Sequence, residues 1–302
     1  MMARIYDGKL AIVTGASRGS FDQKAYLRSS LLTQAPGIGA GIALNFASKG
    51  CNLILNYTSE SSDSAATDLA TELQKTYAVQ VISIRADVSS RAECERMIRA
   101  AKDKFTNTKS GNFQIDIVIN NAAIAFTGPL EEVKEDEFHR IYEVNVLGPI
   151  LLTGACKPYL PTDRSGRIVL LSSINSKVGT EHTTLYSGTK GAIEAMTRVW
   201  ARELAERATV NCVNPGAVAT GQYLVAPDHI KEIIARWNPL TPLAPAREDL
   251  DTTELIEHGD KFGGRPAYIQ EIAGIIATIC NPEFGWSTGG IISANGGLSF
   301  SI

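Results

Sequence analysis

A glycine-rich turn follows the first apolar segment of the chain. The run Leu10-Ala11-Ile12-Val13 leads directly into Thr14-Gly15-Ala16-Ser17-Arg18-Gly19, an order typical of a strand that turns into a helix. Glycines in such a turn let the backbone approach a phosphate group at the positive N-terminus of the helix. A tight turn without a ligand would use the same residues, so the pattern alone is a weak indicator. The sequence therefore predicts a strand-turn-helix unit with a candidate phosphate site.

An additional segment interrupts this turn. The Ile-Gly pair that would complete it stands at Ile38-Gly39, after residues 20–37. Each doubling of loop length costs only about 0.6 kcal/mol, but the N–H groups of this turn must converge on one pyrophosphate. Two origins of the segment stay open, a genuine insertion and a retained in-frame intron, which the genomic sequence would distinguish. It is also open whether Gly19 or Gly37 meets the phosphate.

Strand-like apolar runs alternate with helix-like segments along most of the chain. This alternation predicts a single α/β domain over residues 1–302, a Rossmann-like doubly wound parallel sheet of seven strands with helices on both faces. The expected strands are residues 10–14, 52–57, 79–85, 115–120, 167–172, 209–214 and 291–294.

Amphipathic patterns mark several of the intervening helices. Apolar side chains recur in helical register at Ala65, Leu69, Leu73 and Tyr77 and again at Ile193, Thr197, Trp200 and Leu204. Ser90-Arg91-Ala92-Glu93 has the order of a capping box that opens a helix to about Phe105. The long irregular region 222–266 is expected to overhang the carboxyl ends of the strands as a substrate lid. The apolar pocket beneath it would be formed by Tyr223, Leu224, Trp237, Leu240, Ile174 and Phe126, although these side chains could equally be lid core.

Composition argues against several classes of partner. The net charge is −3 and the basic residues are scattered, so neither nucleic acid nor a membrane surface is expected to bind. The five cysteines lie far apart and are expected to be small core residues, without a metal site or disulfides. No signal-like or membrane-spanning run appears, and a cytoplasmic protein is expected.

Tyr186 and Lys190 are four residues apart and would share one face of a helix. A nearby ammonium group favours the phenolate form of tyrosine, whose ordinary pKa is about 10, and so brings it closer to acid and base chemistry at neutral pH. Taken alone, such a pair is more often a surface pair. Ser173 ends another predicted strand, where a turn serine is the simpler explanation. Asn145 stands inside a helix-like segment, where asparagine is a poor helix former.

Taken in order, these motifs resemble the short-chain dehydrogenase/reductase family, in the branch with a TGxxxGxG turn and a YxxxK pair. The resemblance runs from about Lys9 to Gly297 and includes Asn120-Asn121-Ala122 and Asn214-Pro215-Gly216. It implies that Tyr186 donates a proton to a carbonyl oxygen, that Ser173 hydrogen-bonds the same oxygen, and that Lys190 lowers the pKa of the tyrosine. Asn145 would anchor a water through which the proton is replaced.

The resemblance also implies a nicotinamide cofactor held by the turns that follow the strands. Its contacts would be Gly15, Ser17, Arg18, Gly19, Ile38, Gly39, Asn56, Tyr57, Thr58, Ser59, Asp87, Val88, Asn121, Ala122, Ala123, Tyr186, Lys190, Pro215, Gly216, Val218 and Thr220. Asp87 could instead be only a turn residue before the Ser90 cap. No carboxylate follows the second strand, and Arg18, Thr58 and Ser59 could bind a 2′-phosphate, so NADP(H) is preferred over NAD.

The expected function is the NADPH-dependent reduction of a small-molecule ketone to a secondary alcohol, in a homotetramer or homodimer as is common in the family. Similarity to oxoacyl and hydroxynaphthalene reductases suggests a polyketide-like or aromatic ketone. An enoyl reductase is disfavoured, because that branch spaces its tyrosine and lysine more widely. The alternative is a catalytically silent protein that binds nucleotide or another subunit, because residues 20–37 disrupt the cofactor turn.

Overall fold

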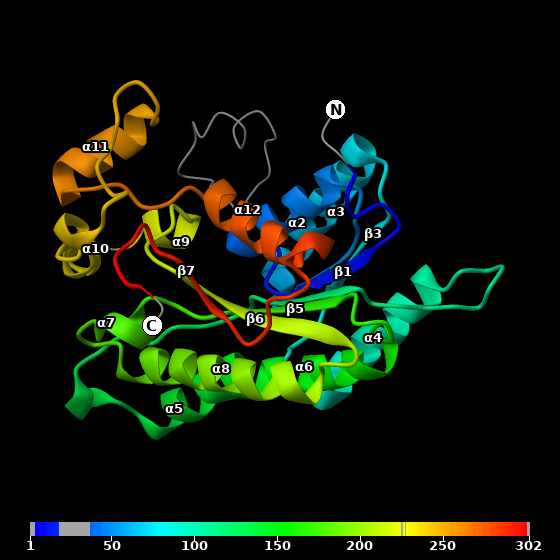
Figure 1. The fold of residues 1–302 in the computed structure, drawn as a ribbon. Coiled ribbons are helices and arrows are strands. Elements are labelled where there is room, and N and C mark those ends of the chain that lie inside the picture. The colour runs from blue at the N-terminus through cyan, green and yellow to red at the C-terminus, as the bar shows by residue number, and fades with distance from the viewer. Residues whose placement is uncertain (1–3, 18–36, 225, 227, 301–302) are drawn as a thin grey trace.

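A parallel sheet of seven strands forms the centre of the molecule in a computed structural model that describes residues 4–17, 37–224, 226 and 228–300 (Figure 1). Its strands are β1 (Leu10–Val13), β2 (Asn52–Tyr57), β3 (Val81–Arg85), β4 (Ile117–Asn120), β5 (Gly166–Leu171), β6 (Ala208–Pro215) and β7 (Ile291–Ala294). They lie in the order β3-β2-β1-β4-β5-β6-β7, and every neighbouring pair is parallel. The predicted fold class is confirmed, and the starts of β3 and β4 lie two residues after the predicted ones.

Two layers of helices cover the sheet (Figure 1). One apolar core joins the sheet to α2 (Ile38–Ser48), α3 (Asp63–Tyr77) and α12 (Ile269–Cys280). The other joins it to α4 (Arg91–Phe105), α6 (Gly148–Cys156) and α8 (Thr184–Glu203). With both faces covered, the central strands can consist almost wholly of apolar residues, and this is why they were recognisable in the sequence. The five cysteines are buried and free of disulfides, as expected.

Shorter elements connect these layers. They are α5 (Glu135–Tyr142), a π-helical turn η4 (Glu143–Leu147), α7 (Asn175–Val178), α9 (Gly221–Leu224), α10 (Asp228–Ala235) and α11 (Thr253–Phe262), with 3-10 turns η2 (Glu60–Ser62), η3 (Leu130–Glu132), η5 (Lys157–Tyr159), η6 (Asn238–Leu240) and η7 (Pro282–Phe284). Region 222–266 was predicted to be irregular, and this was wrong. Its prolines separate short helices with amphipathic sequences, which the irregular composition concealed.

The capping box at Ser90 is only half formed. The Ser90 hydroxyl accepts a hydrogen bond from the Glu93 N–H at 3.4 Å, as predicted. The Glu93 carboxylate, however, accepts from the N–H of Asp87 at 2.6 Å, so it caps the preceding turn instead of the backbone of Ser90.

The order of the strands reverses direction between β1 and β4, which are neighbours in the sheet. Hydrogen bonds join the turns that follow these two strands. The Thr14 hydroxyl accepts hydrogen bonds from the N–H groups of Asn121 and Ala122, both at 2.9 Å. The Asn121 side chain donates to the Thr14 carbonyl at 2.7 Å. This is the switch point of the sheet, where ligands bind in doubly wound folds.

The two halves of the interrupted glycine turn meet here. Gly15 has a φ of +65°, a left-handed conformation that suits glycine. A Cβ atom on Gly39 would lie 2.4 Å from the Gly15 carbonyl oxygen and 2.7 Å from Nδ2 of Asn121, so the start of α2 packs directly on the first half of the turn. The rest of the predicted insertion, residues 20–36, and the predicted cofactor residues Arg18 and Gly19 lie outside the described residues.

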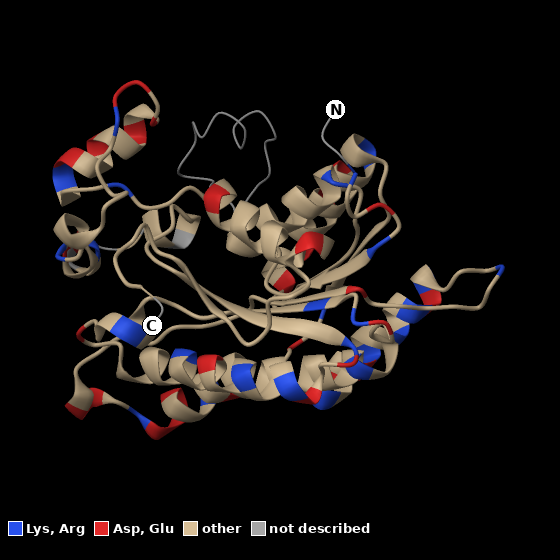
Figure 2. Ribbon diagram, viewed as in Figure 1, with Lys and Arg blue, Asp and Glu red and all other residues tan. Residues whose placement is uncertain are grey.

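Charge is distributed without a stripe of one sign. Figure 2 shows basic and acidic residues interspersed along the outer helices. No helix in the described part of the chain is long and apolar enough to cross a membrane. Within those same residues, no group of three or more His, Cys, Asp and Glu side chains could hold a metal ion.

The close approach at Gly39 predicts a stability defect in Gly39→Ala. The added methyl group has no free space, and such overpacking typically costs about 1–3 kcal/mol. We expect a lower thermal unfolding midpoint by calorimetry. Gly154→Ala in α6 is the matched control, because nothing lies within 4 Å of its new Cβ atom and alanine is the better helix former by about 1 kcal/mol. Equal midpoints for Gly39→Ala and the unaltered protein would contradict this packing.

Candidate active site

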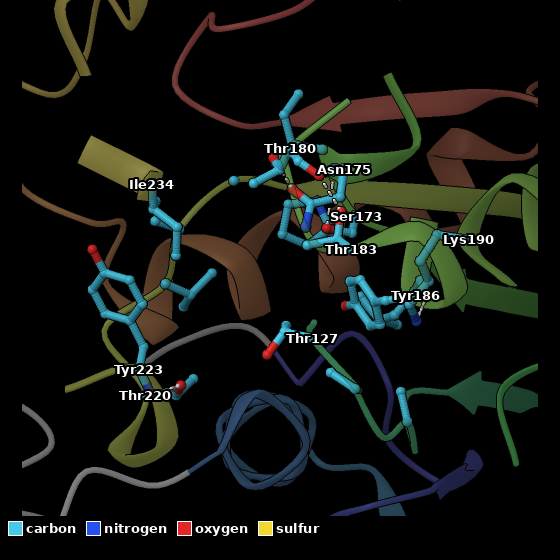
Figure 3. A pocket seen from close by; sticks show the side chains of 18 of the residues that line it. Thr127, Ser173, Asn175, Thr180, Thr183, Tyr186, Lys190, Thr220, Tyr223 and Ile234 are labelled. Atoms are coloured by element: carbon cyan, nitrogen blue, oxygen red, sulfur yellow. Dashed lines mark hydrogen bonds between the residues drawn. The ribbon is translucent and has the colours of Figure 1, made fainter. Parts of the chain in front are cut away.

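A cavity of about 980 Å³ opens at the carboxyl edge of the sheet (Figure 3). The turns after β1, β4, β5 and β6 supply its floor, α8 supplies one wall, and residues from α9 and α10 supply the opposite wall. Polar side chains gather on the side of β5 and α8, whereas Tyr223 and Ile234 face them across the cavity (Figure 3). Side chains from parts of the chain that are far apart in sequence therefore share one cavity.

Tyr186 and Ser173 both line this cavity, Tyr186 from α8 and Ser173 from the turn after β5. Ser173 stands two residues after the end of β5, with its hydroxyl near enough to the Tyr186 phenol to lower its pKa. Burial raises the pKa of Tyr186, and the Ser173 hydroxyl lowers it by less, so the phenol keeps its proton at neutral pH. The pair thus presents a proton donor to the cavity.

Lys190 lies one helical turn after Tyr186 and is almost completely buried. Its ammonium group donates to the Leu171 carbonyl at 2.7 Å and lies 5.4 Å from the centre of the Tyr186 ring. Burial lowers the pKa of Lys190 to about 8, because a charged form is disfavoured away from water. Desolvation of the phenol dominates, so the pKa of Tyr186 is raised overall, and the expected lowering of this pKa by Lys190 stays a prediction.

Asn145 occupies the π-helical turn η4, which interrupts the regular helix at this point. Its amide oxygen accepts from the Ile124 N–H at 2.9 Å, and its amide nitrogen donates to the Ile124 carbonyl at 2.8 Å and to the Thr189 hydroxyl at 3.1 Å. The side chain therefore fastens the loop after β4 to α8. The predicted water-anchoring role stays a prediction.

Many of the predicted cofactor residues lie along the cavity. Its lining includes Gly15, Ile38, Asn121, Ala122, Ala123, Tyr186, Lys190, Pro215, Gly216, Val218 and Thr220. Gly37 lines it as well, at the N-terminus of α2. Within the described residues, the structure therefore brings Gly37 and not Gly39 to the cavity surface, because Gly39 is turned toward Gly15.

Other predicted cofactor residues stand outside this lining, among them Ser17, Tyr57, Thr58, Ser59 and Val88. Asn56 is buried, and its side chain donates to the Ala86 carbonyl at 2.9 Å. The Asp87 carboxylate accepts from Ser89 and pairs with Arg140 at 3.0 Å. Burial alone would raise the pKa of Asp87, but the hydrogen bonds from Ser89 and Arg140 lower it overall. Both side chains tie together the turns beside the cavity.

The predicted apolar pocket is only partly correct. Tyr223 and Ile174 line the cavity, but Leu224, Trp237 and Leu240 lie outside its lining as the described residues define it. Leu240 is 63% exposed. Phe126 lines a neighbouring cavity of about 450 Å³. The isoleucines of α10 were missed, although their spacing at Ile230, Ile233 and Ile234 has the helical period that could have identified them.

Polar residues between β5 and α8 were also missed as site residues. The Thr180 hydroxyl donates to Oδ1 of Asn175 at 2.9 Å, and the Asn175 N–H donates to the Ser173 hydroxyl at 3.3 Å. The Nδ2 amide group of Asn175 has no hydrogen-bond partner among the described residues. Figure 3 shows Asn175 and Thr180 grouped with Ser173 at the cavity. Only their position after a strand end could have indicated a role.

Comparisons with known proteins agree with this geometry. A family model described as enoyl-(acyl carrier protein) reductase matches residues 33–256. The L-xylulose reductase of Aspergillus niger is 39% identical over 322 aligned residues, which cover 99% of this chain and 100% of the relative. The L-xylo-3-hexulose reductase of Hypocrea jecorina is 39% identical over 324 residues, with both chains fully covered.

A solved structure shows the same architecture. The blue fluorescent protein from a metagenomic library, in complex with NADPH, superposes with a TM-score of 0.74 at 28% identity, covering 97% of this chain and 99% of that one. The order of motifs, the seven-stranded sheet and the full-length relatives agree with one another. The chain belongs to the short-chain dehydrogenase/reductase family.

Proposed function

We propose that this protein reduces a ketone to a secondary alcohol with NADPH. The observation that carries the proposal is the convergence of Ser173, Tyr186 and Lys190 on one side of a cavity that also reaches the glycine turn. A proton donor and a phosphate-binding turn in one cavity are what carbonyl reduction with a dinucleotide requires. The reductases among its relatives favour this function over the catalytically silent alternative.

The residues around the glycine turn fit a dinucleotide. Gly15 and Gly37 line the cavity without side chains, so a pyrophosphate could approach the backbone. The N-terminus of α2 has no side-chain cap and no acidic residue in its first turn, which leaves its N–H groups and positive dipole end for an anion.

The side chains at the other end of the cavity fit proton donation. A bound NADPH supplies the hydride to the carbonyl carbon. Tyr186 holds a proton at neutral pH and gives it to the carbonyl oxygen, while the Ser173 hydroxyl stabilises the charge that develops there. The ammonium of Lys190, 5.4 Å from the tyrosine ring, stabilises the phenolate that remains.

The surroundings of β2 favour NADPH over NADH. Thr58 and Ser59 follow this strand with exposed side chains, where an NAD site would have a carboxylate. Arg85 pairs with Tyr57 in the sheet register and adds a positive charge beside these hydroxyls, although Glu60 and Asp63 lie near its guanidinium at 3.4 and 3.5 Å. A 2′-phosphate would find hydroxyl donors and a cation at this place.

The polar side of the cavity favours a polyhydroxylated ketone. The free amide group of Asn175 lies beside Ser173, so it can hydrogen-bond a hydroxyl next to the carbonyl that is reduced. The two named relatives act on L-xylulose and L-xylo-3-hexulose by their names, and such linear sugars carry hydroxyls there. The predicted polyketide-like or aromatic ketone is the second candidate, because Tyr223, Ile230 and Ile234 offer an apolar wall.

Tyr186→Phe tests the central role. Without the hydroxyl, ketone reduction should fall by at least about 100-fold, the typical contribution of a positioned acid, whereas NADPH binding should persist because the ring remains. The measurements are NADPH consumption with L-xylulose and a panel of ketones, and NADPH fluorescence titration, each repeated with NADH. Full activity of Tyr186→Phe would remove this residue from the mechanism. Equal use of NADH would refute the cofactor preference.

The pKa of Lys190 predicts the pH dependence. Because burial lowers this pKa to about 8, the ammonium loses its proton as the pH rises through 8, and its support of the phenolate is lost. The reduction rate should therefore decline above pH 8, although Tyr186, with its raised pKa, is still protonated there. In Lys190→Arg the charge persists, so the remaining activity should decline only at a higher pH. Identical profiles for both proteins would exclude Lys190 as the titrating group.

Asn175→Leu tests the substrate class. Loss of the amide donor should lower kcat/KM for L-xylulose by about 10-fold or more, because one hydrogen bond to a buried hydroxyl is lost, but leave an alkyl methyl ketone nearly unaffected. Thr180→Val should also lower kcat/KM for L-xylulose more than for the methyl ketone, but by a smaller factor, since Thr180 only orients the amide. If both the unaltered protein and Asn175→Leu reduce a bicyclic aromatic ketone faster than L-xylulose, a polyketide-like or aromatic ketone is favoured as the substrate.

A further inference from the structure

Glu194 is a buried carboxylate that the mechanism above does not use. It stands one helical turn after Lys190 on α8, so Tyr186, Lys190 and Glu194 follow one another along the same face of this helix. Its residue is only 4% exposed. A carboxylate at such a depth is costly unless hydrogen bonds surround it.

Four donors converge on this carboxylate from three different elements. Oε1 accepts from Ser172 after β5 at 3.0 Å, from Ser176 of α7 at 2.5 Å and from Asn214 of β6 at 3.0 Å. Oε2 pairs with Lys177 of α7 at 2.8 Å. Burial alone would raise the pKa of Glu194, but the bonds from Lys177, Ser176 and Ser172 lower it, so the group is an anion at neutral pH.

We propose that Glu194 is a positioning residue that fixes the Ser173 hydroxyl against Tyr186 by anchoring α7 to the ends of β5 and β6. The inference deepens the proposed function and rests on it for the activity measurements below. Glu194 itself touches neither the cavity surface nor the reacting oxygen.

The path from Glu194 to Ser173 is short. Ser176, which Glu194 holds, donates its backbone N–H to the Ser173 carbonyl at 3.0 Å. Within the same turn the Asn175 N–H donates to the Ser173 hydroxyl at 3.3 Å. The orientation of that hydroxyl therefore depends on where α7 begins.

The helix α7 cannot keep this place by itself. It has four residues, too few for a helix to be stable without external contacts. On one side the Ile174 N–H donates to the Pro215 carbonyl at 2.8 Å, and on the other side Glu194 binds Ser176 and Lys177. Without Glu194, Ser176 and Lys177 lose their anionic partner on α8, while Ser176 keeps its bonds to the Ser173 carbonyl at 2.8 Å and from the Asn214 amide at 3.1 Å. The attachment of α7 to α8 is therefore weakened.

Asp116 provides a matched control for the structural cost of losing such a group. It is also 4% exposed, and its carboxylate accepts from the Leu10 N–H at 2.9 Å, from Lys9 at 2.9 Å and from Gln114 at 2.8 Å. It stands just before β4, at the end of the sheet opposite to the cavity. Removing either carboxylate unbalances a similar buried network, but only Glu194 is connected to Ser173.

The test is a double-mutant cycle with Glu194→Met, Ser173→Ala and the combined variant, assayed for NADPH-dependent ketone reduction. Glu194→Met should lower kcat by about 10- to 100-fold, because a displacement of about 1 Å at a reacting group can cost 100-fold. In the Ser173→Ala background the same change should cost less than about threefold, since the hydroxyl that Glu194 positions is gone. Asp116→Leu should shift the unfolding midpoint but leave kcat within about twofold. Equal losses in both backgrounds would overturn the proposal, as would an equal loss of kcat in Asp116→Leu.

A conservative variant guards against unfolding of Glu194→Met. In Glu194→Gln the amide oxygen can still accept from Ser172, Ser176 and Asn214, and only the pairing with half-exposed Lys177 is lost. Its kcat should therefore stay within about fivefold of the unaltered enzyme, because the three hydrogen bonds to the oxygen that holds Ser176 remain. A loss in Glu194→Gln as large as that of a folded Glu194→Met would contradict the positioning role of the oxygen.

A second readout needs no substrate. The Ser173 hydroxyl lowers the pKa of Tyr186, so NMR titration of isotope-labelled tyrosine, with Tyr186→Phe to assign the signal, reports on the position of this hydroxyl. Glu194→Met should raise this pKa as Ser173→Ala does, and Asp116→Leu should leave it unchanged. If Glu194→Met leaves the pKa unchanged, the proposal fails, whether or not the protein reduces ketones. If no ketone is reduced but the pKa rises, only the proposed function fails.

Discussion

The parallel hydrogen bonding of β1, β4, β5 and β6 places the ends of four strands side by side. Every polar turn that follows one of these strands must then open on the same edge of the sheet. The glycine turn after β1, the Asn121 turn after β4, Ser173 after β5 and Gly216 after β6 meet there because of this register. The helices of the two outer layers decide only which side chains reach over that edge.

Two buried charges on α8 show how the number of hydrogen-bond partners controls protonation. Lys190 has one carbonyl partner, so burial dominates and its pKa falls toward neutrality. Glu194 has hydrogen bonds from Lys177, Ser176 and Ser172, and they outweigh its own cost of burial. One group is thus left able to change its charge near physiological pH, whereas the other is held as a permanent anion. The first property suits chemistry and the second suits a structural anchor.

The strands and the catalytic face of α8 were predictable because their signals are local. A strand buried on both faces is an apolar run, and a spacing of four residues places Tyr186 beside Lys190. The helices of region 222–266 were missed because prolines divide their short amphipathic patterns. Tertiary contacts decided the rest: the bonds of Asp87 to Arg140, of Asn145 to Ile124 and of Glu194 to Asn214 join residues whose spacing in the sequence carries no information.

Tyr186, Lys190 and Glu194 follow one another at intervals of four residues on one face of α8, so the helical rise sets the distances between these groups in the site. Each group lies about 6 Å along the helix axis from the next, and each faces a different residue at the end of β5 or just after it: Tyr186 faces Ser173, Lys190 binds the Leu171 carbonyl and Glu194 binds the Ser172 hydroxyl. One residue added or removed between them would rotate the later groups by about 100° away from the sheet. This stretch of the chain can therefore diverge in evolution by substitution but not by a change in length.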